Sequence, residues 1–273
     1  MQVIRPDSLD DALAALARDT QLAPVAGATD LFVSWPHREV FPAAVLDLSL
    51  LRSQLGGIRA GADGLEIGAL VTYWDAICSS DCQRDWPLLV AAARQVGAIQ
   101  IQTRGTWAGN IANGSPAADG VPVLMAYGAR VVLASQSGRR EVALDEYYTG
   151  YKESVKRADE LIVAIRTPRR AWRRQWFYKV GARRAQAITK VGVAIVQSDD
   201  GWRVVANSVA PTVVRCRGLE EALNAGRSFG APHEIADALK ADISPIDDIR
   251  STAAYRATVL SRLLYHWLRE QGL

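Results

Sequence analysis

A glycine-rich segment in the middle of the chain, TRGTWAGNIANGSPAADG at residues 103–120, constrains the fold more than any other feature. Glycine adopts backbone conformations that other residues avoid, so this composition favours tight turns. A second glycine-containing loop, VAGATDL at residues 25–31, lies about 80 residues earlier, and both loops carry Thr, Asp or Asn. Exposed backbone N–H groups and such side chains can surround phosphates, so the two loops suit a ligand with a pyrophosphate.

The spacing of the glycines argues against the common nucleotide motifs. Neither loop contains G-x-G-x-x-G or G-x-x-x-x-G-K-[ST], so a Rossmann dinucleotide site and a P-loop are not expected. Glycine-rich turns are more often plain turns than ligand sites. On the residues alone, phosphate binding therefore stands beside a purely structural role for both loops.

The N-terminal part of the chain alternates between strand and helix patterns. Four segments, at residues 3–4, 8–17, 22–25 and 44–48, predict a small β-α-β-like lobe of about 55 residues. Ser8 is placed to cap its helix. Beyond this lobe, glycines separate short alternating segments such as GLEIGALV, which predict antiparallel strands joined by tight turns.

Helix signals surround the glycine-rich segment. Thr72 is placed to cap one helix and Pro87 to open another. For the next helix, VPVLMAYGA, we expect Ser115 at the N-cap and Pro116 at the first helical position. Asp119 would then lie in its first turn, where a carboxylate is favoured. A strand, RVVLAS, follows.

The C-terminal part begins after a basic stretch, and we expect a domain boundary at residues 167–173. Two apolar strands at residues 188–196 and 202–210 are joined by SDDG, a typical hairpin turn. Three helices are expected at residues 219–225, 232–240 and 251–270.

Composition excludes several classes of protein. A net charge of +3 is too small to indicate nucleic-acid binding, and the basic excess at residues 166–184 fits a solvated face, an acidic partner or cofactor phosphates. No apolar run reaches the roughly 18 residues that a membrane helix needs, and the acidic early N-terminus is unlike a signal peptide. We expect a cytoplasmic protein. Cys78, Cys82 and Cys216 lack the spacing of an iron–sulfur or zinc site, so no metal is expected in this chain.

Four blocks of sequence resemble one family, the FAD-binding subunits and domains of molybdenum hydroxylases such as xanthine dehydrogenases and bacterial carbon monoxide dehydrogenase. VAGATDL resembles its A-G-G-T-D-L loop, and residues 105–119 resemble its G-T-I-G-G-N-[IL]-A-N-A-S-P-x-x-D segment. YKVGARRAQAITKVGVAI at residues 178–195 and SPIDDIRSTAAYRATVL at residues 244–260 are similar to two further blocks. The blocks occur in the family's order and span nearly the whole chain.

The resemblance implies an α+β fold. Residues 1–168 would form a two-lobed FAD-binding domain of the p-cresol methylhydroxylase and vanillyl-alcohol oxidase type, with lobe 1 at about 1–55 and lobe 2 at about 56–168. Residues 169–273 would form a small α+β C-terminal domain like that of carbon monoxide dehydrogenase flavoproteins. FAD would lie between the lobes.

The resemblance also implies a set of cofactor-binding residues and no catalytic residue for an organic substrate. The matching positions are Ala26, Gly27, Ala28, Thr29, Asp30, Leu31, Thr106, Gly109, Asn110, Asn113, Asp119, Ile162 and Lys179. The pyrophosphate would lie over both loops, and Asn113 and Asp119 would lie near the adenosine or ribityl portion. Ile162 and Lys179 match flavin-contacting positions, where a lysine would stabilise negative charge on the reduced ring. The residues alone leave plainer roles open: Asp119 as a helix acid in the first turn, Ile162 as a core residue and Lys179 as a solvated lysine.

The sequence departs from the family pattern where the cofactor is expected. Ala28 and Ala108 stand where relatives usually have the second glycine of a pair, Trp107 replaces a branched aliphatic residue and Gln102 replaces a frequent arginine. If those glycines serve the backbone, each alanine would weaken FAD binding. The three histidines, His37, His233 and His266, fall outside the flavin blocks, so FAD is expected to be held non-covalently.

The resemblance therefore implies an electron-transfer subunit. It would take electrons from the [2Fe–2S] clusters of a small ferredoxin-like subunit, in a complex with a large molybdopterin-binding subunit, and pass them to an external acceptor. The alternatives are an assembly or binding subunit with a degenerate FAD site, and a self-sufficient flavin oxidase. Asp247, Asp248 and Arg250, in the last block, are expected to cap and brace the final helix.

Overall fold

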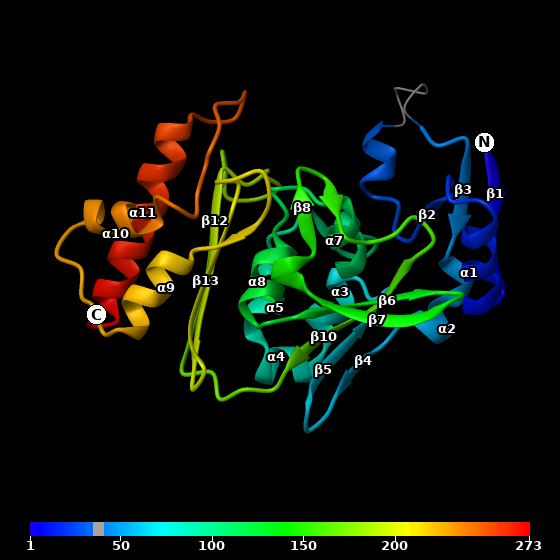
Figure 1. Cartoon of the computed structure of the whole chain (residues 1–273), viewed down its shortest axis with the longest axis horizontal. Helices are drawn as coiled ribbons and strands as arrows, with labels where there is room; N and C mark the ends of the chain where they lie inside the picture. Colours follow the sequence, from blue (N-terminus) through cyan, green and yellow to red (C-terminus); the bar gives the residue numbers. More distant parts are fainter. Residues whose placement is uncertain (35–40) are drawn as a thin grey trace.

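The computed structural model describes residues 1–34 and 41–273, so His37 lies outside the described residues. Three parts lie in a row along the longest axis of the molecule: an N-terminal lobe, a central part and a C-terminal part (Figure 1). Each part is built around a sheet of its own. The mixture of helices and antiparallel and parallel strands confirms the predicted α+β class.

The N-terminal lobe is a small parallel sheet with one helix. Its elements are β1 (Gln2–Ile4), α1 (Leu9–Arg18), β2 (Ala23–Val25) and β3 (Ala44–Asp47). Both β1 and β2 pair with β3 in parallel, as the predicted β-α-β pattern requires. The Ser8 side chain accepts a hydrogen bond from the N–H of Asp11, which confirms Ser8 as the N-cap.

The central part is an antiparallel sheet covered by short helices. The sheet has the order β4-β5-β10-β6-β7, and a two-stranded hairpin, β8-β9, lies beside it. The strands are β4 (Ile58–Ala60), β5 (Gly64–Gly68), β6 (Arg130–Ser135), β7 (Gly138–Ala143), β8 (Tyr148–Gly150), β9 (Glu153–Ser154) and β10 (Leu161–Pro168). The pairing of β4 with β5 confirms the antiparallel strands predicted there.

Short helical segments join this sheet to the N-terminal lobe and cover it. They are η1 (Leu31–Ser34), η3 (Ser49–Leu51), α2 (Arg52–Leu55), α3 (Tyr73–Cys78), α4 (Ser80–Asp85), α5 (Pro87–Ala93), α6 (Ile99–Gln102), α7 (Trp107–Asn113), α8 (Gly120–Ala126) and η4 (Leu144–Glu146). Thr72 caps α3 through a capping box with Asp75, and Pro87 is the first residue of α5, as predicted.

The glycine-rich segment differs from its prediction in two respects. It contains a helix, α7, which Thr106 caps and which ends at Gly114, where φ is +63°. The expected roles of Ser115 and Pro116 are wrong: the Ser115 hydroxyl accepts from the N–H of Ala117 and closes a turn. The next helix, α8, starts only at Gly120, with Asp119 at its N-cap.

The C-terminal part places three helices on one face of a four-stranded antiparallel sheet. The strands, in the order β11-β12-β13-β14, are β11 (Arg174–Val180), β12 (Val191–Ser198), β13 (Gly201–Asn207) and β14 (Val214–Arg215). The helices are α9 (Arg217–Asn224), α10 (Pro232–Leu239) and α11 (Ala253–Glu270), close to the predicted ranges.

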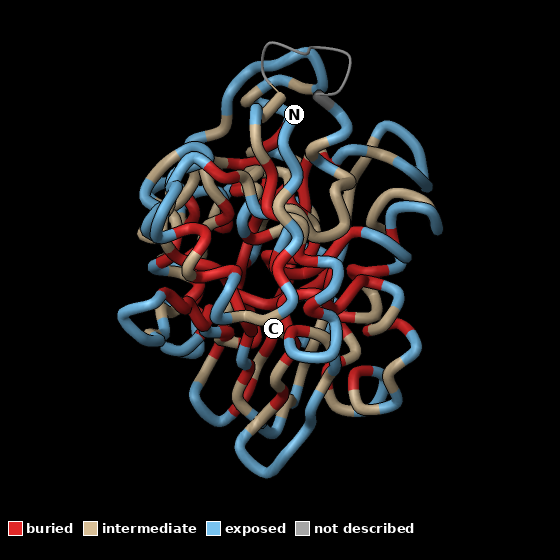
Figure 2. Tube along the Cα trace, turned by 90° about the vertical axis from the view of Figure 1, so that its right-hand side faces the viewer, coloured by how far each residue is buried: buried red, intermediate tan, exposed pale blue. Residues whose placement is uncertain are grey.

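Both faces of strand β12 are buried, because alternate residues point in opposite directions. Val193 and Ile195 belong to the core under the three C-terminal helices. Ala194 and Val196 belong to the core that the central part shares with the N-terminal lobe. The C-terminal sheet is therefore packed directly onto the central part. Viewed along the row of three parts, the buried segments lie in the interior and exposed loops surround them (Figure 2).

Asp247 and Asp248 brace the start of α11, as expected from the last sequence block, but the N-cap of the helix is Thr252. Asp247 accepts from the N–H of Ala253, and Asp248 accepts from the side chain of buried Arg256 at 2.7 Å. No helix within residues 1–34 and 41–273 is long and apolar enough to cross a membrane.

Candidate cofactor site

The two glycine-containing loops meet backbone to backbone. A Cβ atom added to Gly27 would lie 1.7 Å from the carbonyl oxygen of Arg104, so no residue with a side chain fits there without displacing the backbone. On the other side of this contact, a Cβ on Gly105 would lie 3.3 Å from the hydroxyl of Thr29. Segments almost 80 residues apart in sequence thus form one surface.

The first loop turns sharply after Gly27. Ala28 has φ of +60°, a left-handed conformation that glycine adopts without strain. Its carbonyl accepts from the N–H of Phe32, and Leu31 begins the 3-10 turn η1. Within the described residues, no acceptor is found for the backbone N–H groups of residues 27–31. A row of free N–H groups is a typical anion-binding surface.

The second loop contributes one face of α7. Thr106, Gly109, Asn110 and Asn113 have the i, i+3, i+4, i+7 spacing that places residues on one side of a helix. The side-chain amide of Asn113 donates to the Asp30 carboxylate in the first loop at 3.1 Å. The side-chain carbonyl of Asn110 accepts from the backbone N–H of Gly120 at 3.2 Å. Four predicted residues are therefore brought together by a helix that the sequence did not predict.

This face of α7 runs between two cavities. The smaller, of about 100 Å³, lies between the N-terminal lobe and the central part, and Ala26, Thr106, Gly109 and Ile162 are among its lining residues. The larger, of about 650 Å³, lies between the central and C-terminal parts. Asp30, Asn110, Asn113 and Asp119 line the larger cavity. Residues that the sequence singled out thus line both cavities, which follow one another along α7, and we call the two cavities together the elongated site.

Asp119 and Lys179 form a buried ion pair beside the larger cavity. The Lys179 ammonium lies 2.6 Å from the Asp119 carboxylate and also donates to the carbonyl of Gln95, while the Thr189 hydroxyl donates to Asp119. The Lys179 side chain is only 6% exposed and the Asp119 side chain only 11%. Burial raises the pKa of Asp119, and the contacts with Lys179 and Thr189 act against that rise. Lys179 lies behind Asp119 and does not line the cavity itself.

The smaller cavity is lined by two charged residues that sequence reasoning missed. Lys156 and Glu160 both line it, next to Ile162. The Lys156 amine donates to the carbonyls of Arg157 and Glu160 at 3.0 and 3.1 Å, and burial lowers its pKa. Their only signal in the sequence is a charged cluster, KESVKRADE, just before an apolar strand.

The C-terminal part supplies a further wall of the larger cavity. Thr189, Ser208, Asp248, Arg250 and Arg256 all line it. The last sequence block thus both braces α11 and borders the cavity, which extends the purely structural role predicted for it. Buried Arg256 joins the pieces, because its guanidinium donates to the carbonyl of Ser208 and to Asp248.

The sequence of residues 1–170 matches the family described as the FAD binding domain in molybdopterin dehydrogenase, and residues 176–271 match the carbon monoxide dehydrogenase flavoprotein C-terminal domain. The chain belongs to the FAD-binding subunits of the molybdenum hydroxylases. The family membership that four sequence blocks predicted is confirmed. FAD is the cofactor of this family, and its members are flavoprotein components of oxidoreductases.

Relatives are similar over nearly their whole length. The carbon monoxide dehydrogenase medium chain of Hydrogenophaga pseudoflava is 30% identical over 269 residues, which cover 95% of this chain and 92% of that protein. The xanthine dehydrogenase FAD-binding subunit of Escherichia coli O157:H7 is 29% identical, with 95% and 91% covered. A solved carbon monoxide dehydrogenase from Hydrogenophaga pseudoflava, which lacks the Mo-pyranopterin moiety of the molybdenum cofactor, has a TM-score of 0.89 at 28% identity and covers 97% of this chain and 95% of that one.

Proposed function

We propose that this chain is the electron-transfer flavoprotein subunit of a heteromeric molybdenum dehydrogenase. It takes electrons from [2Fe–2S] clusters of a small ferredoxin-like subunit, in a complex with a large molybdopterin-binding subunit, and passes them to an external acceptor. The observation that carries the proposal is the polar face of α7, which meets the Gly27 loop and joins the two cavities. Relatives named as medium chains and subunits support partner chains of this kind.

FAD fits the elongated site in one orientation. The larger cavity, of about 650 Å³, has room for the flavin ring, whereas the smaller, of about 100 Å³, suits the adenine end. In this orientation Ile162, which lines the smaller cavity, contacts the adenine end and not the flavin ring, unlike the role that the resemblance implies. The pyrophosphate then lies between, over the free N–H groups that follow Gly27 and over the Thr106 end of α7. The proposed cofactor residues are Ala26, Gly27, Ala28, Thr29, Asp30, Leu31, Thr106, Gly109, Asn110, Asn113, Asp119, Ile162 and Lys179, with FAD held non-covalently.

Bound FAD supplies reversible acceptance of electrons. The residues of this chain hold it and set its electrostatic surroundings. Asp119 presents a carboxylate to the larger cavity, and the Lys179 ammonium behind it limits the negative charge that reaches the ring. Lys156 adds a cation at the smaller cavity.

We further propose that residues 1–168 form the FAD-binding domain and residues 169–273 the C-terminal domain. The end of β10 at Pro168 and the start of β11 at Arg174 support this division. In the basic stretch between them, Arg169 and Arg173 are paired with Asp85 and Asp199 of the same chain. A partner surface is therefore better sought at exposed positions 182–186, beside the larger cavity.

A degenerate FAD site remains a second candidate, and one observation favours it. Ala28 occupies a left-handed position in the loop that would hold the pyrophosphate. The visible spectrum of the purified chain separates the two candidates. The proposed function predicts two absorption bands in the near-ultraviolet and blue and up to one FAD per chain, whereas a colourless protein that FAD cannot reconstitute would show a degenerate site.

The electron-relay role has its own test. Co-expression with neighbouring large and small subunits should yield one complex, in which the substrate reduces the flavin of this chain. Metal analysis of the isolated chain should find neither molybdenum nor iron. Stoichiometric iron in a clean preparation, or purification from the native host without any iron–sulfur or molybdenum subunit, would contradict the proposal.

A further inference from the structure

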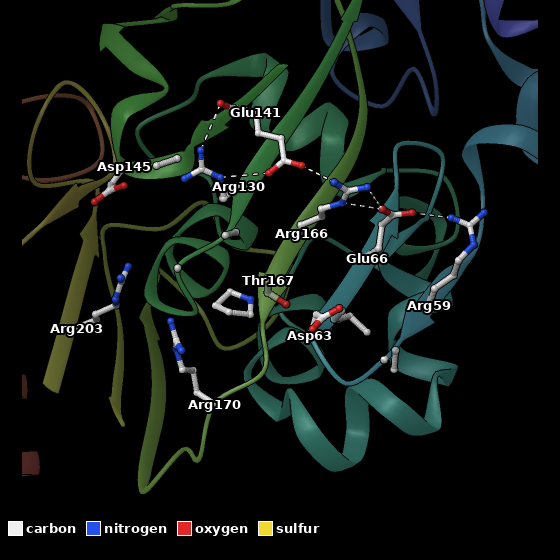
Figure 3. Close-up of a pocket in the computed structure, with 18 residues that line it drawn as sticks. Arg59, Asp63, Glu66, Arg130, Glu141, Asp145, Arg166, Thr167, Arg170 and Arg203 are labelled. Atoms are coloured by element: carbon white, nitrogen blue, oxygen red, sulfur yellow. Dashed lines mark hydrogen bonds and ion pairs between the residues drawn. The ribbon is translucent and has the colours of Figure 1, made fainter. Parts of the chain in front are cut away.

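A third cavity, of about 690 Å³, lies at the opposite end of α8 from the cofactor site. Asp119 precedes α8 and borders the larger cofactor cavity, whereas Gly128 follows α8 and borders this third cavity. Its walls come from β4, β5, β6, β7, β10 and β13, and it shares no lining residue with either cofactor cavity (Figure 3). It is therefore a separate site at the junction of the central and C-terminal parts.

One wall of this cavity is a ladder of ion pairs across the central sheet. Glu66 joins Arg59 to Arg166, and Glu141 joins Arg166 to Arg130 (Figure 3). The charges on this wall are thus already paired with one another. Such exposed cross-strand pairs are expected on a solvated sheet face and indicate no ligand by themselves.

The other wall contains a cation without a partner. The guanidinium of Arg203, on β13, forms no hydrogen bond or ion pair within the described part of the chain, whereas the backbone of Arg203 pairs with β12. The nearby carboxylates of Asp145 and Glu220 are held by Arg215, at 3.0 Å in the case of Asp145. Burial and the charge of Arg215 lower the pKa of Arg203, and the charges of Asp145 and Glu220, which do not contact it directly, offset only part of that decrease. A half-buried guanidinium normally has an anionic partner, because removing its charge from water is costly.

The backbone around Arg203 makes room for its side chain. Gly128 has φ of +72°, and a Cβ there would lie 3.2 Å from an Nη atom of Arg203. Arg170 borders the same cavity, and its ion pair is with Asp200, an exposed carboxylate. In Figure 3 the side chains of Arg170 and Arg203 are drawn on the same side of the cavity, away from the ladder.

We propose that this cavity binds a small phosphate-bearing molecule, with the phosphate held by Arg203 and Arg170. Planar guanidinium groups match phosphate oxygens in geometry and charge. A volume of about 690 Å³ is large enough for a nucleotide as well as for free pyrophosphate. The ligand ties β13 of the C-terminal part to the end of α8, and so fixes the packing that places Lys179 next to Asp119.

Calorimetric titration with sodium pyrophosphate at constant ionic strength tests this site. The FAD-loaded chain is used, so that the cofactor site cannot take up the probe, and ADP is titrated in a parallel series. Arg203→Gln should weaken binding of both probes at least tenfold. The matched control is Arg139→Gln, which removes the same charge from an exposed position on β7 outside the cavity and should bind as the parent does.

Thermal melting gives a second measurement that does not depend on the affinity of one probe. Without anion, Arg203→Gln should melt no lower than the parent, because the arginine has no partner to lose. Pyrophosphate should raise the melting temperature of the parent and of Arg139→Gln but not of Arg203→Gln. Equal responses of all three proteins would overturn the proposal. So would absence of binding to the parent together with loss of a partner subunit from Arg203→Gln, which would show that a protein carboxylate occupies the cavity.

Discussion

The two loops that form the cofactor site do so by different means. The first, at residues 26–31, offers mainly its backbone: Gly27 permits contact with Arg104, and the N–H groups that follow have no acceptor within the described residues. The second is a helix, α7, which offers side chains at helical spacing. A backbone wall is sensitive to space and φ, whereas a side-chain wall is sensitive to the identity of each residue.

The two alanines that replace family glycines illustrate this difference. Ala28 has φ of +60°, so a side chain is strained there. Ala108 is the second residue of α7 and only 6% exposed, where alanine is a good helix former. The sequence analysis expected each alanine to weaken FAD binding, but the backbone at Ala108 gives no reason for that. Replacement by glycine should therefore stabilise the protein at Ala28 and destabilise it at Ala108.

Gly27→Ala should have the largest effect, because it fills the contact between the two walls. Its Cβ would meet the Arg104 carbonyl at 1.7 Å, and backbone at that distance cannot move aside cheaply. We expect a loss of stability above about 5 kcal/mol, in the extreme range for one substitution, and no measurable FAD binding. Urea unfolding and FAD fluorescence titration measure both quantities.

The matched control for this variant is Gly61→Ala. A Cβ on Gly61 meets nothing within 4 Å, so its stability should stay within about 0.5 kcal/mol of the parent. Equal behaviour of Gly27→Ala and Gly61→Ala would show that the two loops are not in backbone contact.

Lys179→Met tests the buried ion pair beside the larger cavity and should have the next largest effect. It leaves the buried Asp119 carboxylate without its cation, which typically costs about 3–5 kcal/mol. The double variant Asp119→Asn with Lys179→Met should recover most of that stability, because neither charge remains. Arg59→Gln removes an exposed ion-paired arginine, 63% exposed, and should cost below about 1 kcal/mol in the same urea assay. A Lys179 variant no less stable than Arg59→Gln would argue against a buried pair.

Local signals predicted the outer elements of the fold well. Ser8, Thr72 and Pro87 act through neighbours a few residues away, so their helix starts could be read directly. Helix α7 was missed because Gly109 and Asn110 are poor helix formers. Packing compensates in this case: Trp107 is fully buried and packs against Tyr73 with ring centroids 4.9 Å apart and ring planes tilted by 58°, a contact that no local pattern reveals.

The candidate site was predictable only in part, for a related reason. The family resemblance pointed to Asp119 and Lys179 separately, but their pairing depends on how the C-terminal sheet packs against α8. Lys156 gave only the weak signal of a charged cluster, and Arg203 gave none, because the cavities that they border are assembled from segments distant in sequence.

Ala108→Gly should weaken the helical wall. Glycine costs up to about 1 kcal/mol relative to alanine in a helix, less in the first turn, and the buried methyl group contributes about 0.8 kcal/mol more, so we expect a loss of about 1–2 kcal/mol. FAD binding should weaken with it, because Thr106 and Gly109 are positioned by the same turn. Tighter FAD binding to Ala108→Gly in fluorescence titration would contradict the helical assignment and restore the reading in which this alanine obstructs the cofactor.

Ala28→Gly should have the smallest effect and the opposite sign. A left-handed conformation costs a residue with a side chain about 1–2 kcal/mol, and glycine removes that cost. Glycine also makes the unfolded chain more flexible, which returns about 0.4–1 kcal/mol, so the net gain should be about 0.5–1 kcal/mol. At about 1.4 kcal/mol per tenfold, FAD binding would tighten about two- to fivefold if the loop becomes ordered only with the cofactor. Ala26→Gly is the control from the same loop: Ala26 has no positive φ, so glycine there brings the entropic loss and the loss of a partly buried methyl group, with no strain to relieve. If both variants lose stability equally, Ala28 is not strained, and the backbone wall tolerates a side chain at every position except Gly27.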